Sequence, residues 1–364
     1  METLRTDLPL TGDPASDAEA GLVEDELQRF FADAKLGAVA VGAPYLALWE
    51  ALERAAAGGG RSRPRLVLLA YRHLGGTDTR TAARLAASYE LLHSALIVHD
   101  DVIDRDVVRR GVPNVSGSYR TKALREGAAP ALAEHAGATA GILAGDLALS
   151  GAYRLLRSLD VSQSIDRRLH DILDEAVFSA VGGEVFDVEF SRSARMPSLE
   201  DITKTAHQKT AVYSFEAPLQ AGAVLAGAPD SAVAALKSFG RFAGITYQLV
   251  DDILGVFGGE DSTGKTGWGD LREGKRTVLL AYAATRPQWN SIASLIGTPD
   301  LGARDAEHIR TVLVTCGAKD FAVGLADEYA QRALSHLESD GVPAALRGRL
   351  RRLLLAVVAG VRTA

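Results

Sequence analysis

The sequence has little of several features that would define a class of function. A single cysteine, Cys316, in 364 residues excludes an internal disulfide and a cysteine-based zinc site. No uninterrupted apolar run is long enough to span a membrane, and Met1 to Ala20 carry acids where a secretory signal needs a basic and then an apolar segment. A net charge of -6, with no long basic run before the C-terminal helix, argues against nucleic acid as a partner. We therefore expect a cytoplasmic protein with no stable membrane insertion.

Strand signals are also scarce, because the chain shows little period-2 alternation and no tight-hairpin dipeptide between β-branched runs. Helical periodicity is present instead, and hydrophobic residues make up 47% of the chain, enough for a large core. We predict a mobile tail over residues 1–18, where periodicity is absent, and an all-α domain over residues 19–364. The long helices are expected at residues 79–105, 131–159, 163–190, 200–226 and 230–257.

Three acids are crowded at the end of the expected helix 79–105. At about 3.6 residues per turn, Asp100 and Asp104 lie one turn apart on one face, with Asp101 beside them. Like charges at this spacing repel, and oxygen ligands on a short open arc suit Mg²⁺, which shares its shell with waters and substrate phosphates. Arg109 and Arg110 follow and would hold those phosphates. A solvated acidic helix end, balanced by the arginines, is the alternative for this stretch taken alone.

A second acidic pair, Asp251 and Asp252, ends another apolar run far along the chain. A glycine-rich loop with Lys265 and Lys275 follows, and its lysines could meet a metal-bound phosphate. Residues 259–266 also spell the P-loop pattern Gly-x-x-x-x-Gly-Lys-Thr. That motif requires a preceding strand and a helix that starts at its lysine, whereas this copy follows a helical segment and precedes more glycine. We interpret the match as accidental.

Several other polar residues stand out along the chain. Lys209, Thr210 and Gln248 interrupt apolar helical stripes, and each alone is explained as well by a surface or capping position. Arg61 and Arg63 lie in a turn that opens the next helix. Exposed amides and arginines there would make an anion site, although a flexible, solubilising connector explains the turn equally well. These residues gain meaning only as a set.

With both acidic segments, the arginine pair and the Gly-Lys loop in order, the sequence resembles the trans-isoprenyl diphosphate synthases of the polyprenyl synthetase family, most closely those that make geranylgeranyl diphosphate. The resemblance runs from about Leu22 to the C-terminal helix. It implies an isoprenoid synthase-like helical bundle around a central cavity, a homodimer, and about three Mg²⁺ ions with substrate bound. It also implies that isopentenyl diphosphate condenses with allylic diphosphates (dimethylallyl, geranyl, farnesyl) by ionisation, condensation and elimination.

The resemblance further assigns roles to individual positions. The metal ligands would be Asp100, Asp101, Asp104, Asp251 and Asp252, with Asp101 as a supporting acid. The allylic diphosphate would contact Arg109, Lys209, Lys265 and Lys275, and isopentenyl diphosphate would contact Arg61, Arg63, His93 and Arg110. Four residues would carry catalysis. Lys209 and Lys265 would neutralise the departing diphosphate, while Thr210 and Gln248 would orient the leaving group and stabilise the cation.

The chain departs from the family pattern at three positions. Gly60 stands where the family usually has a lysine that grips isopentenyl diphosphate, and Arg61 is the expected substitute. Gly255 stands where the second motif often has a third acid, which predicts weakened metal binding. Glu184 replaces a usual glutamine and adds a negative charge that would favour metal.

Product length is expected to depend on the helix that precedes Asp100. Family members that make a fifteen-carbon product commonly have bulky aromatics at the positions of Ala95 and Leu96, which are small or aliphatic here. Tyr89 lies on nearly the same stripe, about 16 Å further down the axis, and could be a deeper stop. We therefore expect geranylgeranyl diphosphate, with longer products also open.

Two other functions remain open at the level of sequence. A terpene cyclase shares the helical fold and one acidic motif, but it predicts an Asn/Ser/Glu second metal site in place of Asp251 and Asp252. A non-catalytic or regulatory partner subunit of a prenyl synthase is the other possibility, and Gly60 and Gly255 are the features that favour it. A longer-chain polyprenyl diphosphate synthase is the variant closest to the leading hypothesis.

Overall fold

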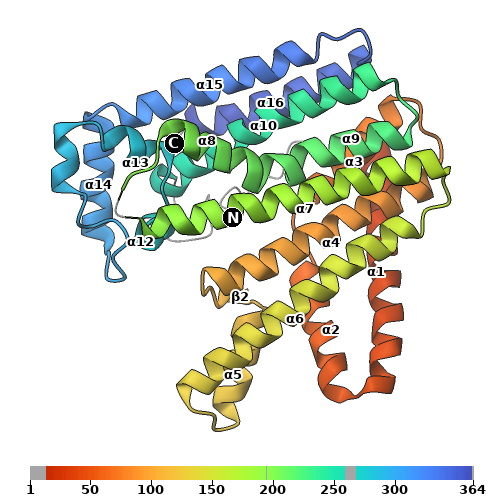
Figure 1. Ribbon diagram of the computed structural model, residues 1–364, viewed down its shortest axis with the longest axis horizontal. Helices are drawn as coiled ribbons and strands as arrows, with labels where there is room; N and C mark the ends of the chain where they lie inside the picture. The colour runs from red at the N-terminus through yellow and green to blue at the C-terminus, as the bar shows by residue number, and fades with distance from the viewer. Residues whose placement is uncertain (1–13, 194, 259–267, 363–364) are drawn as a thin grey trace.

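The computed structural model describes residues 14–193, 195–258 and 268–362, and their regular structure is almost entirely helical (Figure 1). The first half contains α1 (Pro14–Val41), α2 (Ala43–Ala56), α3 (Ser62–His73), α4 (Thr79–Ile103), α5 (Val115–Arg125), α6 (Pro130–Arg157) and α7 (Gln163–Arg192). The second half contains α8 (Leu199–Ala206), η1 (His207–Glu216), α9 (Ala217–Leu225), α10 (Asp230–Phe257), α12 (Gly269–Glu273), α13 (Val278–Ala283), η2 (Pro287–Ser291), α14 (Ala303–Thr315), α15 (Ala318–His336) and α16 (Ala344–Arg362). In the described residues the strands are β1 (Val108–Arg109) and β2 (Val112–Pro113), an antiparallel pair.

The prediction of an all-α fold is confirmed, and the long helices lie close to their expected ranges. Two details differ. Helix α1 begins at Pro14, inside the range that the sequence predicts as a tail. The stretch 200–226 is not one regular α-helix, because its central part, η1, is a π-helix. A π-helix has one more residue in each turn and often occurs at functional sites.

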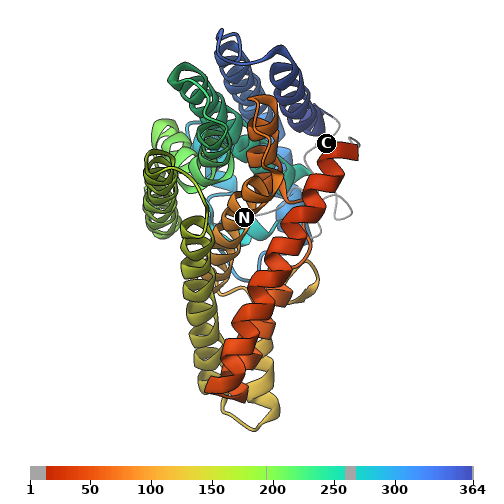
Figure 2. The ribbon, with the colours of Figure 1, turned by 90° about the vertical axis from the view of Figure 1, so that its right-hand side faces the viewer.

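Helix α4 runs through the interior and packs against α6, α3, α1 and α9. A layer of α10, α15 and α16 lies along the upper edge in Figure 1, and η1 lies between α7 and α10. The α1–α2 hairpin and the α5–α6 pair extend together away from the rest of the molecule (Figure 2). The C-terminal end of α4 meets η1, which is distant in sequence, through Asp100 and Lys209. None of the described helices combines the length and the apolarity that a membrane crossing needs.

Candidate active site

The first wall of the candidate site is the C-terminal end of α4. Asp78 caps the start of this helix by accepting hydrogen bonds from the backbone N–H groups of Arg80 and Thr81, which satisfies donors that the first turn leaves unpaired. At the other end Asp100 and Asp101 are buried, with 4% and 3% of their surface exposed. Two carboxylates at this depth need cations or donors close by.

Arg109 supplies one of those cations. It comes from β1 and donates hydrogen bonds from Nε and Nη2 to Asp101 Oδ1, at 2.9 and 2.6 Å. Its Nη2 also lies 3.8 Å from Asp100 Oδ2. Burial raises the pKa of Asp101, and the Arg109 charge opposes that rise. Asp101 thus holds Arg109 in place beside Asp100, which agrees with a supporting rather than a direct metal-binding role.

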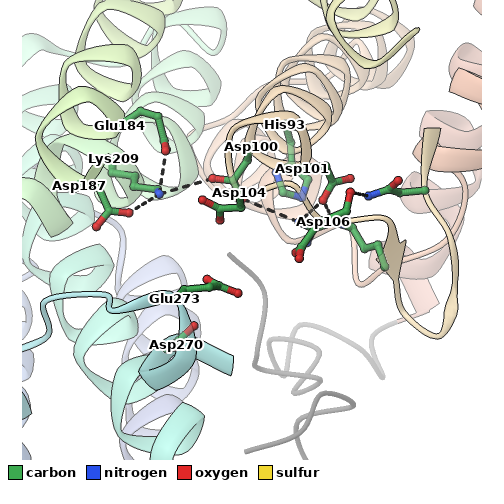
Figure 3. A network of polar contacts seen from close by, with 12 residues as sticks. His93, Asp100, Asp101, Asp104, Asp106, Glu184, Asp187, Lys209, Asp270 and Glu273 are labelled. Atoms are coloured by element: carbon green, nitrogen blue, oxygen red, sulfur yellow. Dashed lines mark hydrogen bonds and ion pairs between the residues drawn. The ribbon is translucent and has the colours of Figure 1, made fainter. Parts of the chain in front are cut away.

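The second wall begins with Lys209, which extends from η1 toward α4 (Figure 3). Its Nζ lies 2.5 Å from Asp187 Oδ2, 2.8 Å from Glu184 Oε2 and 3.4 Å from Asp100 Oδ1. Burial alone would lower the pKa of Lys209, but the three carboxylates outweigh it and raise the pKa above its ordinary value. Lys209 therefore remains charged, and it links the two walls.

Gly183 is the reason that η1 can lie so close to α7. A Cβ atom at position 183 would lie 2.3 Å from the backbone nitrogen of Lys209 and 2.6 Å from its Cα, closer than real Cβ atoms come. Any larger residue would therefore push η1 away from α7. The backbone that carries Lys209 is positioned by the absence of a side chain on the neighbouring helix.

Thr210, Gln248 and Asp252 form a chain of hydrogen bonds beside Lys209. Thr210 Oγ1 donates to Gln248 Oε1 at 2.8 Å, and Gln248 Nε2 donates to Asp252 Oδ1 at 2.8 Å. Burial raises the pKa of Asp252 well above its ordinary value, and Asp270 and Asp251 add to the effect. Together with Lys209, Asp251, Asp270 and Lys275, these residues line one small pocket of about 70 Å³. The structure thus places six predicted site residues around one pocket: Lys209, Thr210, Gln248, Asp251, Asp252 and Lys275.

Lys275 joins the two walls at their outer edge. Its Nζ lies 2.8 Å from Glu273 Oε2, 3.4 Å from Asp104 Oδ2 and 3.7 Å from Asp270 Oδ1. Burial lowers the pKa of Lys275, but the surrounding acids, Asp270 first, raise it well above its ordinary value. Lys265 and the P-loop-like string at 259–266 fall within residues 259–267, outside the described residues.

A second pocket, of about 410 Å³, lies between α2, α4 and the β1–β2 hairpin. Four of the predicted residues line it: the supporting acid Asp101 and the predicted diphosphate contacts His93, Arg109 and Arg110. Arg110 lies over the Gly58–Gly59 turn, where a Cβ at Gly59 would approach its Nη2 to 2.9 Å. Glycine is also suited to the positive φ angles of this turn, 78° and 82°.

Arg61 and Arg63 do not line this pocket as the sequence predicts. Arg61 donates to Glu24 and Glu90, each at 2.6 Å, and its side chain is 9% exposed. Arg63 is buried and donates to Tyr213 and Ser214. Both arginines are drawn away because α1, α4 and η1 supply acceptors that only the tertiary structure brings near.

Arg54 is the basic residue of this pocket that the sequence analysis missed. It lies in the last turn of α2 and lines the pocket together with Arg110. Its only signal in the sequence is a cation in the last turn of a helix that ends at a glycine-rich turn. A cation in the last turn also complements the helix dipole, so the position of Arg54 does not by itself indicate a binding role.

A third pocket, of about 410 Å³, opens beside Asp100 between α4, α6, α7 and η1. Glu184, Lys209 and Asp100 form its polar rim, and its walls are largely apolar: Leu96, Ile103, Ile142, Ala180, Val181 and Val185. Ala95, by contrast, is 1% exposed and belongs to the hydrophobic core. Of the two adjacent positions predicted to limit product length, Leu96 lines this pocket and Ala95 does not.

Tyr89, the predicted deeper stop, is 1% exposed. Within the described part of the chain, its buried hydroxyl has no hydrogen-bond partner. Burial raises its pKa above the ordinary value for a phenol. The role of Tyr89 as a stop stays a prediction.

The carboxylates suit Mg²⁺ only in combination with a diphosphate. Across residues 14–193, 195–258 and 268–362, no three His, Cys, Asp or Glu side chains converge closely enough to hold a metal ion by themselves. Mg²⁺ commonly takes one or two carboxylates and completes its shell with waters and substrate phosphates. Acids on facing walls, with lysines between them, fit that manner of binding. Asp100, Asp104 and Asp251 are the carboxylates that would hold it.

Comparison with known proteins agrees with this geometry. The family described as Polyprenyl synthetase matches residues 47–313. The chain belongs to the polyprenyl synthetase family. It is a trans-prenyl diphosphate synthase, a prenyltransferase with the all-α isoprenoid synthase fold.

Individual relatives of this synthase differ in their products. It is 35% identical to a geranylfarnesyl diphosphate synthase of Aeropyrum pernix, over 76% of this chain and 82% of that one. It is 30% identical to the heptaprenyl diphosphate synthase component 2 of Geobacillus stearothermophilus, over 92% and 93%. A geranylgeranyl pyrophosphate synthase structure from Corynebacterium glutamicum, complexed with isoprenyl diphosphate and magnesium, superimposes with a TM-score of 0.88 at 30% identity. That match covers 94% of this chain and 98% of the other.

Proposed function

We propose that this synthase is Mg²⁺-dependent and makes geranylgeranyl diphosphate from isopentenyl diphosphate and allylic diphosphates. The observation that carries the proposal is the apolar pocket that opens directly beside Asp100 and Lys209. A prenyl chain grows by being pushed away from the diphosphate at which it reacts. An apolar space beginning at that point is what such growth needs.

The allylic diphosphate would bind between the two walls. Asp100, Asp104 and Asp251 would hold Mg²⁺, while Lys209 and Lys275 contact the phosphate oxygens. Bound metal would neutralise the departing diphosphate and so promote ionisation of the allylic C–O bond. The lysines act in the same direction, because fixed charges in a buried site stabilise developing negative charge strongly. Thr210 and Gln248 would orient the leaving group from beside Lys209.

Isopentenyl diphosphate would bind in the pocket beside the β1–β2 hairpin. His93, Arg109 and Arg110 line it, and Arg54 supplies a further cation near the turn that contains Gly60. The double bond of isopentenyl diphosphate would attack the allylic cation, and the departed diphosphate would then take up the released proton. This route requires no dedicated base, and the apolar walls shield the cation from water.

Product length is the finer part of the proposal. Leu96 is aliphatic and leaves the pocket beside Asp100 open, which favours a product of more than fifteen carbons. The names of the two relatives, geranylfarnesyl and heptaprenyl diphosphate synthase, show that longer products also occur in this family. A longer-chain polyprenyl diphosphate synthase is therefore the alternative.

We also propose that the protein is a cytoplasmic homodimer. Large apolar side chains are exposed along α6 and α7, among them Ile142, Leu143, Val181, Val185 and Phe178, which is 83% exposed. A surface of this kind is typical of a protein interface. Sedimentation should show a dimer, and Phe178→Glu should shift it toward monomer; a monomeric wild type would contradict the proposal.

A partner subunit is the second candidate, favoured by the similarity to a heptaprenyl diphosphate synthase component 2. Both candidates are tested by incubating the pure protein with Mg²⁺, labelled isopentenyl diphosphate and each allylic primer, and separating the products by chromatography. A twenty-carbon product supports the leading proposal. No elongation by the pure protein would overturn it, and activity restored only by a second subunit would identify a partner subunit.

A further inference from the structure

The second acidic motif lacks an acid at Gly255, yet a carboxylate lies beside that position. Asp251 and residue 255 are four apart in α10, so an acid at 255 would share a helix face with Asp251. An ideal Cβ built on Gly255 would lie 2.9 Å from Asp270 Oδ2. The Asp270 carboxylate thus occupies the space into which a side chain at 255 would extend.

Asp270 comes from α12, eighteen positions beyond Asp252 in the chain, and it reaches the same pocket as Asp251 and Asp252. Its place is set by the backbone: Lys275 donates its N–H to the Asp270 carbonyl at 3.0 Å, and Gly274 ends α12 with a positive φ of 76°. Figure 3 shows Asp270 and Glu273 together on the side opposite Asp104. The carboxylate is therefore directed into the cleft by a short, well-defined turn of chain.

Asp270 is not needed to hold Lys275. Glu273 Oε2 lies 2.8 Å from Lys275 Nζ, closer than Asp270 Oδ1 at 3.7 Å. An acid kept only to pair with this lysine would duplicate Glu273. Asp270 adds negative charge to the α10 wall, because it lines the same pocket as Asp251 and Asp252. Additional negative charge at that wall favours a cation bound together with a diphosphate.

We propose that Asp270 supplies the carboxylate that the second acidic motif lacks at Gly255 and helps Asp251 to hold the metal-bound diphosphate. Glycine at 255 leaves this space to the Asp270 carboxylate. This inference rests on the proposed Mg²⁺ dependence. It also removes the reason to expect weak metal binding from Gly255, and with it one feature that favours a non-catalytic subunit.

The test measures metal binding without turnover, using Mn²⁺ as the probe with inorganic pyrophosphate, followed by electron paramagnetic resonance. Asp270→Ala should weaken Mn²⁺ binding by about 10- to 100-fold, the range found when a supporting residue of a metal site is removed. Arg272→Gln is the matched control, because Arg272 lies on the same short helix but is exposed and donates to the Leu301 carbonyl, away from the space beside Gly255. It should bind Mn²⁺ as the wild type does.

A relocation experiment sharpens the test. Gly255→Asp combined with Asp270→Ala moves the carboxylate back onto α10 and should recover most of the lost Mn²⁺ affinity. The control pair is Gly255→Ala combined with Asp270→Ala, which places a methyl group but no charge at position 255. This pair should not recover the lost Mn²⁺ affinity. Thermal melts of all variants separate loss of metal binding from loss of folding.

The outcomes distinguish this inference from the proposed function. If the wild type binds Mn²⁺ with pyrophosphate and Asp270→Ala binds it equally well, the inference is wrong while the proposed function stands. Recovery by the alanine pair would show that Asp270 acts only by filling space, and would also overturn the inference. If the wild type itself binds no Mn²⁺ with pyrophosphate, the proposed function fails.

Discussion

The two walls of the active site are built in different ways. The α4 wall carries Asp100, Asp101 and Asp104 within one helical turn and a half of a single helix. The opposite wall is assembled from α7, η1, α10 and α12, and each contributes one to three side chains. The spacing of the acids on the first wall therefore follows from local helix geometry. The second wall depends on how closely four separate elements pack, so it is open to disruption at positions that never touch substrate.

The largest effect is expected at the α4 wall. Asp100→Asn should lower activity by about 100- to 1000-fold, because it removes a buried carboxylate that would hold metal and that faces Lys209. Asp252→Asn should cost much less, since an amide resembles the protonated carboxyl that burial favours at this position. The measurement is incorporation of labelled isopentenyl diphosphate. Equal losses in the two variants would show that the walls are equivalent in function.

The assembly of the second wall is tested at Gly183. Gly183→Ala should destabilise the protein by about 1–3 kcal/mol and lower kcat, because the new Cβ would overlap the backbone of Lys209. Gly182→Ala is the matched control on the same helix. A Cβ at 182 meets nothing within 4 Å, so this variant should gain about 0.5–1 kcal/mol from helix propensity. Denaturant melts and steady-state rates would decide, and similar behaviour of the two variants would contradict the close packing of α7 on η1.

The continuation of the α4 wall below the acids is tested at Leu96. Leu96→Phe should shorten the product, because Leu96 lines the apolar pocket beside Asp100. Ala95→Phe should instead lower stability by about 1–3 kcal/mol through overpacking of the core, with little change in product length. Chromatography of the products and thermal melts measure both effects. A shortened product from Ala95→Phe alone would place the tunnel on the other side of α4.

The smallest effect is expected from the charge of Glu184 on the second wall, and it concerns how stability depends on pH. Burial, together with Asp100 and Asp187, raises the pKa of Glu184 to about 7, from an ordinary value near 4.5. The folded protein therefore holds this proton more tightly than the unfolded chain, and the associated stability is lost as the pH rises from about 4.5 through 7. In metal-free protein, Glu184→Gln should remove about 1–3 kcal/mol of that pH dependence. Unfolding free energies at pH 5 and pH 8 would test this, and an unchanged slope would contradict the assignment.

Much of the site could be predicted because its signals are local. Helical spacing alone places Asp100 and Asp104 on one face, and the resemblance of the ordered motifs to a known family adds Lys209, Gln248 and Asp251. The pattern also predicts correctly where most long helices lie. It places the start of the first helix too late, because Pro14 to Ala20 lack the apolar periodicity on which the prediction depends.

Position in the sequence does not indicate contacts that depend on partners distant along the chain. Arg61 has the position of a substrate ligand, but Glu24 of α1 and Glu90 of α4 both lie within hydrogen-bond distance of its guanidinium. Arg54 carries no motif, yet the folding of α2 against the β1–β2 hairpin places it in the pocket. No spacing rule indicates either result, because each depends on which charges the packing brings together.

By itself, the sequence determined the all-α architecture, the family and the acidic end of α4, since helical periodicity and short-range spacing follow from local backbone geometry. Only the tertiary structure decided that Lys209 faces Asp100, that Gly183 sets this approach, and that Asp270 lies beside Gly255. Those contacts join residues on different helices, and close packing around glycine rather than any local pattern determines their distances.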